Sequence, residues 1–424
     1  MMRKISIVAF GAAVALALAG CAAAEPAGSD GEAEGAEIRV WLVGADTPQE
    51  ARDYLKETFE DENPGSTLVI EEQAWGGLVD KLTTALSGSD SPDVVEVGNT
   101  QAAAFTTAGA FLDITDEYDA LGGDDLLPGF VEAGSVGDAF FAAPYYSGAR
   151  VVFYDTALYE ELGLEVPTTL DEYIANGQAI AEAKPGVSGI YFPGQDWYNA
   201  LPYIWENGGD IATLDGDEWV PALSTDGSIA GLEMVQEVMT TASVAPKDGN
   251  EAEAQVPYCA GQIGHLSAPS WFKWSILAPA DAEAPGCPER EASLGVFALP
   301  GLDGGPAQVF AGGSNIAVSA NSANPELAKK ALAIMLSDEY QSILGGAGLV
   351  PALTSLGDTV GTDATAQAIA QAASNAKLTP ASPAWAEVEA SGVLQDFFVK
   401  IAQGGDVADL AAETDARIAE ILNP

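Results

Sequence analysis

Short apolar runs alternate along this chain with longer stretches of helical spacing. Residues 38–43 form an apolar run that predicts a strand, and apolar residues recur at helical spacing over 51–59. Thr47-Pro48-Gln49-Glu50 predicts a helix start, as a capping box with proline at the first helical position. Asn63-Pro64-Gly65 ends this helix, and residues 67–71 predict a second strand. The segment is therefore a βαβ unit, whose strands run parallel.

The same alternation continues further along the chain. A helix is predicted near 78–87 and a strand over 93–97, while Thr169-Leu170-Asp171-Glu172 is typical of a capping box that opens another helix. Strands that alternate with helices define the α/β class. Because about 388 residues follow position 36, which is more than one hydrophobic core usually serves, we expect two lobes.

The N-terminus has the layout of an export signal. Two basic residues precede an apolar stretch over 5–18, which is too short to span a bilayer comfortably. The stretch ends in Leu18-Ala19-Gly20-Cys21, which resembles a bacterial lipobox. The resemblance implies that residues 1–20 are a signal peptide and that Cys21 carries lipid, which would anchor the protein to the outer face of the cell membrane.

Residues 21–36 separate this anchor from the first predicted strand. They contain no large apolar residue and cannot bury enough surface to offset the entropy of ordering, so we predict a flexible linker. After Leu18 no apolar run approaches membrane length.

The charge balance narrows the range of partners. The formal net charge is -47, with 16 basic and 63 acidic residues. Nucleic acid and anionic lipid headgroups require clustered Lys and Arg, which this sequence does not supply, so neither is an expected partner. The acidic residues are spread along the whole chain, and we interpret them as a solvated surface that maintains solubility.

Cysteine and histidine usage argues against a metal site. Besides Cys21 the chain has only Cys259 and Cys287, an isolated pair in an exported protein, which we expect to form a disulfide. His265 is the only histidine, so a His-rich zinc site cannot be assembled. It lies in an apolar setting that is typical of a buried core histidine. We expect no metal and no cofactor.

Several segments, in order, resemble the extracellular solute-binding proteins of ABC importers, in the carbohydrate-binding family that includes maltose-binding protein. The most specific block starts at Val152-Phe153-Tyr154-Asp155 and ends at Val166-Pro167-Thr168-Thr169-Leu170-Asp171-Glu172. Weaker matches are Pro92-Asp93-Val94-Val95, residues 108–113, Gly208-Gly209-Asp210, Ala260-Gly261-Gln262 before Pro269-Ser270-Trp271, and Gly312-Gly313-Ser314 before residues 324–328. Tyr154-Asp155-Thr156 departs from the family's usual Tyr-Asn-Lys.

The resemblance implies a two-lobed, periplasmic-binding-protein-like (type II) fold with a hinged cleft between the lobes. Three crossovers are expected near 145–148, 310–313 and 350–355, where small residues can absorb rotation. Lobe 1 would comprise 37–145 plus 312–350, and lobe 2 would comprise 146–311 plus 351–424. The implied protein is a monomer that binds a carbohydrate and delivers it to the permease subunits of an ABC transporter.

A neutral sugar is bound by flat aromatic faces and by fixed donors and acceptors for its hydroxyl groups. Matching the family's pocket segments residue by residue gives the expected ligand-binding set, of which Trp271 and Trp197 are the strongest candidates. The set is Trp75, Asn99, Thr100, Tyr146, Asp196, Trp197, Tyr198, Asn199, Trp271, Gly312, Gly313, Ser314, Asn315 and Trp385. Tryptophan more often packs in a core, and we expect this of Trp41, Trp205, Trp219 and Trp274.

Other functions stay open at this point. An exported glycoside-acting enzyme would need two carboxylates, which so acidic a chain always permits, but no nucleophile elbow, Walker loop or His-Glu-x-x-His motif is present. Other solutes are polyamines, which fit the acidity, glycerol phosphate, and iron held by Tyr145-Tyr146. Arg150 is the only arginine near the expected cleft, which counts against phosphate. For the tyrosine pair we expect one buried ring and one ring that faces the cleft.

Overall fold

The computed structural model describes residues 35–216, 218–282 and 284–423, and it confirms the first βαβ unit. Strand β1 (Glu37–Val43) is followed by helix α1 (Gln49–Glu62) and strand β2 (Thr67–Gln73). The two strands pair in parallel from Glu37↔Thr67 to Val43↔Gln73. On its other side β1 pairs in parallel with β3 (Val94–Gly98). The predicted signal peptide, Cys21 and nearly all of the predicted linker lie outside the described residues.

The two predicted capping boxes have different outcomes. Thr169 caps α6 (Leu170–Ala183), since its Oγ1 accepts a hydrogen bond from the Glu172 amide at 3.2 Å. The prediction for Thr47 is wrong: α1 starts after Pro48 without a side-chain cap. The Thr47 hydroxyl instead bonds the buried Tyr145 hydroxyl at 2.8 Å, so a tertiary partner replaces the local one.

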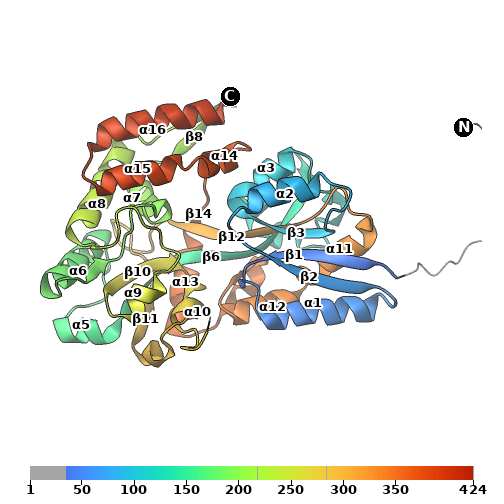
Figure 1. Cartoon of the computed structure of the whole chain (residues 1–424), viewed down its shortest axis with the longest axis horizontal. Coiled ribbons are helices and arrows are strands. Elements are labelled where there is room, and N and C mark those ends of the chain that lie inside the picture. Colours follow the sequence, from blue (N-terminus) through green and yellow to red (C-terminus); the bar gives the residue numbers. More distant parts are fainter. Residues whose placement is uncertain (1–34, 217, 283, 424) are drawn as a thin grey trace, which may run out of the picture. The chain divides into compact units, whose positions relative to one another are not determined.

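The first part of the sheet, in the order β2-β1-β3-β12-β6, forms lobe 1 with the helices around it (Figure 1). Its core is built from side chains such as Leu42, Leu55 and Phe59, all fully buried. The other elements of this lobe are α2 (Leu78–Leu86), α3 (Asn99–Thr107), α4 (Pro128–Ala133), the ribbon of β4 (Ser135–Val136) and β5 (Ala139–Phe140), α11 (Pro325–Met335), α12 (Asp338–Gly346), and the 3-10 turns η1 (Thr115–Glu117), η2 (Gly123–Asp125) and η5 (Thr354–Val360).

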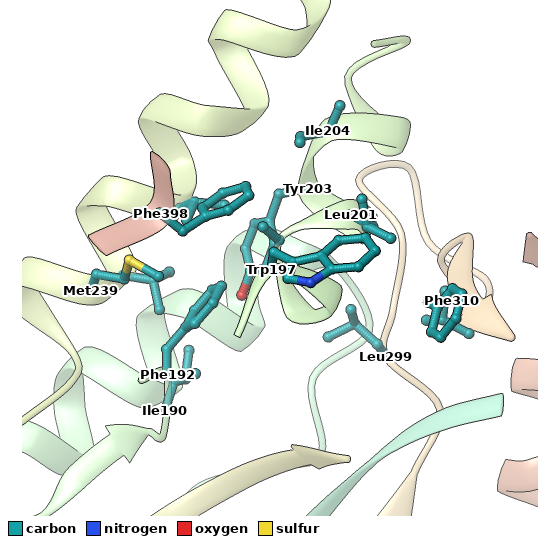
Figure 2. Close-up of a cluster of buried hydrophobic side chains, with 14 of the residues drawn as sticks. Ile190, Phe192, Trp197, Leu201, Tyr203, Ile204, Met239, Leu299, Phe310 and Phe398 are labelled. Carbon is teal, nitrogen blue, oxygen red and sulfur yellow. The ribbon is translucent and has the colours of Figure 1, made fainter. Parts of the chain in front are cut away.

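The sheet continues into lobe 2, where β6 pairs with β10 and β11, and β10 pairs with β7. Figure 2 shows part of its core, in which Phe192, Trp197, Tyr203 and Phe398 lie close together. Its elements are α5 (Thr156–Leu162), β7 (Ser188–Ile190), η3 (Trp197–Asn199), α7 (Leu201–Glu206), β8 (Ala212–Asp215), β9 (Glu218–Pro221), α8 (Asp226–Thr241), α9 (Gln255–Cys259), β10 (Ile263–Pro269), α10 (Phe272–Ile276), η4 (Pro288–Ser293), β11 (Leu294–Phe297), α13 (Ala364–Ser374), β14 (Ala376–Lys377), α14 (Trp385–Ala390), α15 (Val393–Ala402) and α16 (Val407–Leu422).

Two long strands carry the sheet from one lobe into the other. They are β6 (Ala142–Asp155) and β12 (Val309–Val318), which pair antiparallel with Gly148 opposite Gly312. The short strand β13 (Val350–Pro351) pairs with β6, with Val350 opposite Ser147. These pairings lie at the positions where the sequence predicted the crossovers. Gly313 has φ 134°, and a Cβ there would lie 2.3 Å from the Tyr146 carbonyl oxygen, so only glycine fits.

Cys259 and Cys287 are bonded to each other in the structure, with their Cα atoms 5.5 Å apart. The bridge ties α9 to the segment that precedes η4, beside Ile276 at the end of α10. Within the described residues, no helix is both long and apolar enough to cross a bilayer.

Candidate ligand-binding site

Trp75 presents a large aromatic face to solvent at the carboxyl end of the lobe 1 sheet. Its side chain is 41% exposed, and its Nε1–H donates to Asp46 Oδ2 at 2.9 Å. The ring lies against Gly44 and Gly98, where an added Cβ would come within 3.3 Å of it. Ligands of α/β sheets bind where parallel strands end, and these two glycines are at the ends of β1 and β3. Trp75 is therefore an exposed ring held in one orientation.

A buried polar network connects this ring to the crossover strands. The Tyr146 hydroxyl donates to Glu96 Oε1 at 2.9 Å and lies 3.4 Å from Asp46 Oδ2. Ser314 also donates to Glu96 Oε1, at 2.7 Å. Tyr146 is only 1% exposed, so the expected cleft-facing tyrosine is buried in this structure, as Tyr145 is. The Tyr146 hydroxyl contacts the carboxylates of Glu96 and Asp46, which the sequence analysis did not identify.

Burial raises the pKa of Glu96 to about 7, because desolvation of the carboxylate outweighs its hydrogen bonds from Ser314 and Val43. The folded state therefore holds a proton that the unfolded chain releases near its ordinary pKa of 4.5. Stability supplied by this group is complete below pH 4.5 and falls as the pH rises to 7, by up to about 3 kcal/mol.

We expect Glu96→Gln to flatten that pH dependence, because the variant side chain does not titrate. Urea unfolding of both proteins from pH 5 to pH 8 measures the effect. Glu72→Gln is the matched control, since Glu72 is exposed on β2 of the same sheet. An unchanged slope in Glu96→Gln would contradict the assignment.

Trp271 lies directly on the two crossover strands. A Cβ on Gly148 would stand 2.0 Å from its ring, and one on Gly312 would stand 3.2 Å away. Its ring also meets Tyr146 edge to face, with centroids 6.3 Å apart. Trp271 is partly exposed, so it is a second aromatic surface in this part of the molecule. The sequence identified the tryptophan but not its contact with the crossover glycines.

The segment 196–199 is mostly committed to lobe 2 itself. Trp197 is 2% exposed and packs among core side chains such as Tyr203 and Leu299 (Figure 2), so in this structure it is a core residue rather than a platform. Asp196 caps η3 through the Asn199 amide at 3.3 Å, and the Asn199 side-chain amide donates to Ser267 O at 3.0 Å. Tyr198 is the member of the segment whose ring is only partly buried.

The polar side chains of Asp196 and Asn199 are engaged by the buried Arg150. Its guanidinium is 2% exposed, donates to both carboxylate oxygens of Glu251 and to Asn199 Oδ1 at 3.0 Å, and lies 3.7 Å from Asp196. Burial, followed by the charge of Glu251, raises the pKa of Asp196 well above its usual range. The arginine near the expected cleft is thus neutralised internally, and it is not available to an anionic ligand.

Residues from the two lobes meet at α3 and α14. Thr100 donates to Glu389 Oε2 at 2.8 Å, and Asn99 donates to the Ala311 carbonyl at 2.9 Å. Trp385, which the sequence placed at the cleft, is fully buried in lobe 2 and donates to Glu389 Oε1 at 3.1 Å. Its role in this structure is to pack and to orient a carboxylate.

The remaining expected ligand groups face inward or line the crossover. Asn315 is fully buried and donates to the Phe130 carbonyl at 2.8 Å inside lobe 1, so it is a structural residue here. Gly312 and Gly313 are partly exposed backbone positions. Gly312 accepts a hydrogen bond from the Ser147 hydroxyl at 3.2 Å.

Metal and acid–base alternatives lose support from the same geometry. His265 is fully buried against the Tyr159 hydroxyl, and burial lowers its pKa to about 3, so it is a neutral core histidine as expected. Burial raises the pKa of Tyr145 and Tyr146 well above the usual range, which makes both neutral phenols. Tyr145 bonds Tyr340 at 2.6 Å while Tyr146 bonds Glu96, so the two hydroxyls have different partners.

A surface pocket of about 810 Å³ in lobe 2 is separate from this region. Tyr191, Pro246, Glu253 and Gln262 are among its lining residues, and none of the expected ligand residues lines it. Of the expected ligand residues with side chains, Trp75 is exposed and Thr100, Tyr198 and Trp271 are partly exposed. The carboxylates of Asp46 and Glu389, which the sequence did not single out, accept hydrogen bonds from Trp75 and Thr100.

The chain belongs to the bacterial extracellular solute-binding proteins, because the model of that family matches residues 44–342. This membership confirms the resemblance drawn from the sequence, and it makes the chain a binding protein rather than an enzyme. The family is one of exported proteins that serve as substrate-binding components of transporters.

The diacetylchitobiose binding protein DasA of Streptomyces coelicolor is 32% identical over 427 residues, covering 98% of this chain and 97% of DasA. The GacH receptor of Streptomyces glaucescens, solved unliganded and with acarbose, has a TM-score of 0.76 at 23% identity and covers 92% of this chain and 98% of its own. The sugar-binding protein MalE of Xanthomonas citri has a TM-score of 0.77 at 20% identity, covering 91% and 97%. These structures confirm the two-lobed type II fold.

Proposed function

We propose that this protein captures a mono- or oligosaccharide between its two lobes and delivers it to the permease of an ABC importer. The observation that carries the proposal is the orientation of Trp75, an exposed indole fixed by Asp46 at the ends of β1 and β3. An indole face with a carboxylate beside it suits the C–H face and the hydroxyl groups of a sugar. The relatives named above support a sugar, since their names specify diacetylchitobiose, acarbose and sugar in general.

Anionic ligands are disfavoured by the charges in this region. Arg150 is neutralised by Glu251 and Asp196. A second arginine, Arg52, is close to Asp46. It donates to the Gly44 and Thr47 carbonyls and pairs with Glu72. A phosphorylated ligand would therefore meet carboxylates with neither of these arginines free to compensate it, which is costly in a partly buried site.

Binding proceeds by lobe closure. A ligand that touches both lobes makes contacts that only the closed form offers, and it therefore shifts the population toward closure. Gly148, Gly312 and Gly313, on the paired crossover strands, absorb the rotation. The lipid on Cys21 and the linker over 21–36 tether the protein near the permease, which receives the closed form.

A thermal-shift screen tests the proposed ligand class. The purified protein is titrated with diacetylchitobiose, maltose, galactose, maltotetraose, spermidine and glycerol phosphate. A saccharide present at 100 times its Kd stabilises the fold by about 2.7 kcal/mol, which is a measurable rise in Tm. A rise with spermidine or glycerol phosphate, and none with any saccharide, would overturn the proposal.

Trp75→Ala should weaken binding of the best saccharide at least tenfold, about 1.4 kcal/mol, because the ring face is lost. The Tm should stay close to that of the wild type, since Trp75 is 41% exposed and belongs to neither lobe's hydrophobic core. Isothermal titration calorimetry measures the Kd. Trp219→Ala is the control, because Trp219 lies on the β8–β9 hairpin, and its Kd should not change. Equal affinities in wild type and Trp75→Ala would contradict the assigned role.

A further inference from the structure

Glu389 joins the two lobes at a point that the proposed sugar site does not itself explain. It lies on α14, whose Trp385 and Val388 are fully buried in the lobe 2 core. Its partner Thr100 lies on α3, whose Ala102 and Phe105 belong to the lobe 1 core. The hydrogen bond of 2.8 Å between Thr100 Oγ1 and Glu389 Oε2 therefore connects two separate cores across 289 residues of sequence.

The carboxylate is held so that it faces lobe 1. Its second oxygen, Oε1, accepts from the Trp385 indole at 3.1 Å, one turn earlier on the same helix. Trp385 is in turn packed edge to face against Trp197, with ring centroids 6.3 Å apart. Neither side chain can rotate freely, because both indoles are buried in the lobe 2 core. Glu389 is thus presented to Thr100 in one orientation.

No cation compensates this carboxylate within the part of the chain that the structure describes. The elements packed against α14 are α3, η3, α15 and α16. From α3 no ionisable side chain is available. The turn η3 contributes Tyr198, and Arg150, 5.6 Å from the centre of that ring, is paired with Glu251. Among the charged groups of α15 and α16, Lys400 pairs with Glu413, and Asp415 accepts a hydrogen bond from Ser224. Asp396, Asp409 and Glu420 are exposed, and Arg417 is partly buried.

We infer that Glu389 is an interlobe latch, and that closure of the lobes is accompanied by uptake of a proton at its carboxyl group. The inference rests on the proposed lobe closure but names a residue and a proton that sugar capture alone does not require. In the open form α3 withdraws, Thr100 is lost as a partner, and water reaches the carboxylate. In the closed form the carboxyl group is partly buried with no cation beside it, and this desolvation favours the neutral acid against the hydrogen bonds from Thr100 and Trp385.

The direction of the linkage follows from the two states. In the conformation described here, burial raises the pKa of Glu389 to about 7, against hydrogen bonds from Thr100 and Trp385 that lower it. A solvated glutamate has its ordinary pKa of 4.5. Closure is therefore favoured fully below pH 4.5 and loses this contribution as the pH rises to 7. Between pH 5.5 and pH 7.5 the affinity for a ligand that requires closure should fall roughly 20-fold.

Calorimetry in paired buffers detects the proton directly. Titration with diacetylchitobiose at pH 6 in phosphate and in imidazole should show uptake approaching one proton per ligand bound in the wild type, and little in Glu389→Gln. Glu387→Gln is the matched control, because Glu387 is an exposed glutamate on the same helix and its variant should keep the uptake. Equal uptake in wild type and Glu389→Gln, or none in either, would overturn the latch.

Small-angle scattering without ligand makes the test independent of the sugar. The radius of gyration of the wild type should increase from pH 5.5 to pH 7.5, while that of Glu389→Gln should stay at the smaller value. Thr100→Val should give the larger value at both pH values, because it removes the partner on α3. Failure of every saccharide to bind would refute the proposed function and leave this result standing. A wild-type radius that does not respond to pH, in a protein that binds saccharide without proton uptake, would refute the latch alone.

Discussion

Gly148→Ala is expected to abolish saccharide binding, with a loss of at least 100-fold in affinity. The new Cβ would stand 2.0 and 2.3 Å from two carbon atoms of the Trp271 ring, which is far inside van der Waals contact. The obstacle is a rigid indole, so the whole ring must leave the crossover strands. Displacement of a packed aromatic group costs about 1–3 kcal/mol in strain, and the proposed stacking face is lost as well.

Alanine substitutions at two other glycines should lower the affinity by smaller amounts or not at all. At Gly312 the added Cβ would be 3.2 Å from the same ring, so Gly312→Ala should weaken binding only moderately. At Gly346, the last residue of α12, nothing lies within 4 Å of the new methyl group, and Gly346→Ala should bind like the wild type. Calorimetry measures the Kd of the three variants, and near-UV circular dichroism follows the environment of the Trp271 indole. Wild-type affinity in Gly148→Ala would show that Trp271 takes no part in binding.

The fold was predictable because its determinants are local. The helical spacing over 51–59 and the apolar run of β1 each depend on residues close in sequence, and both elements were found within a few positions of their bounds. Thr169 capped its helix as predicted for the same reason. Thr47 did not, because Tyr145 offered its hydroxyl a buried partner 98 residues away. Local rules fail where a tertiary contact competes with them.

The site was predictable only in part because its polar contacts are long-range. Trp75 and Trp271 stand out by residue type, and the structure leaves both rings partly exposed. Glu96 and Glu389 do not stand out among 63 acidic residues. Glu96 is distinguished by full burial beside Ser314, 218 residues away in sequence, and Glu389 by partial burial beside Thr100, 289 residues away. Trp197 shows the converse: the sequence identified an aromatic residue, but only the packing of lobe 2 reveals that its face is covered.

Arg150→Met should destabilise the protein by about 3–5 kcal/mol, because it removes the only cation from a buried cluster of charges. The guanidinium is 2% exposed and holds Glu251 by two hydrogen bonds, while Asp196, whose side chain is 1% exposed, lies 3.7 Å away. Methionine fills a similar volume, so the effect is electrostatic rather than a cavity. The exposed pair Lys184–Glu161 supplies the control, and Lys184→Met should cost less than about 1 kcal/mol.

The charge origin of this defect can be separated from loss of packing. Without Arg150, no cation compensates the negative charge of Glu251 beside the buried Asp196, so protonation of the pair relieves the variant more than the wild type. The defect should therefore shrink between pH 7.5 and pH 5, and the double variant Arg150→Met/Glu251→Gln should recover part of the lost stability. Urea unfolding at the two pH values measures both effects. A defect of the same size at both, with no recovery in the double variant, would mean that Arg150 contributes through its packed stem and not through its charge.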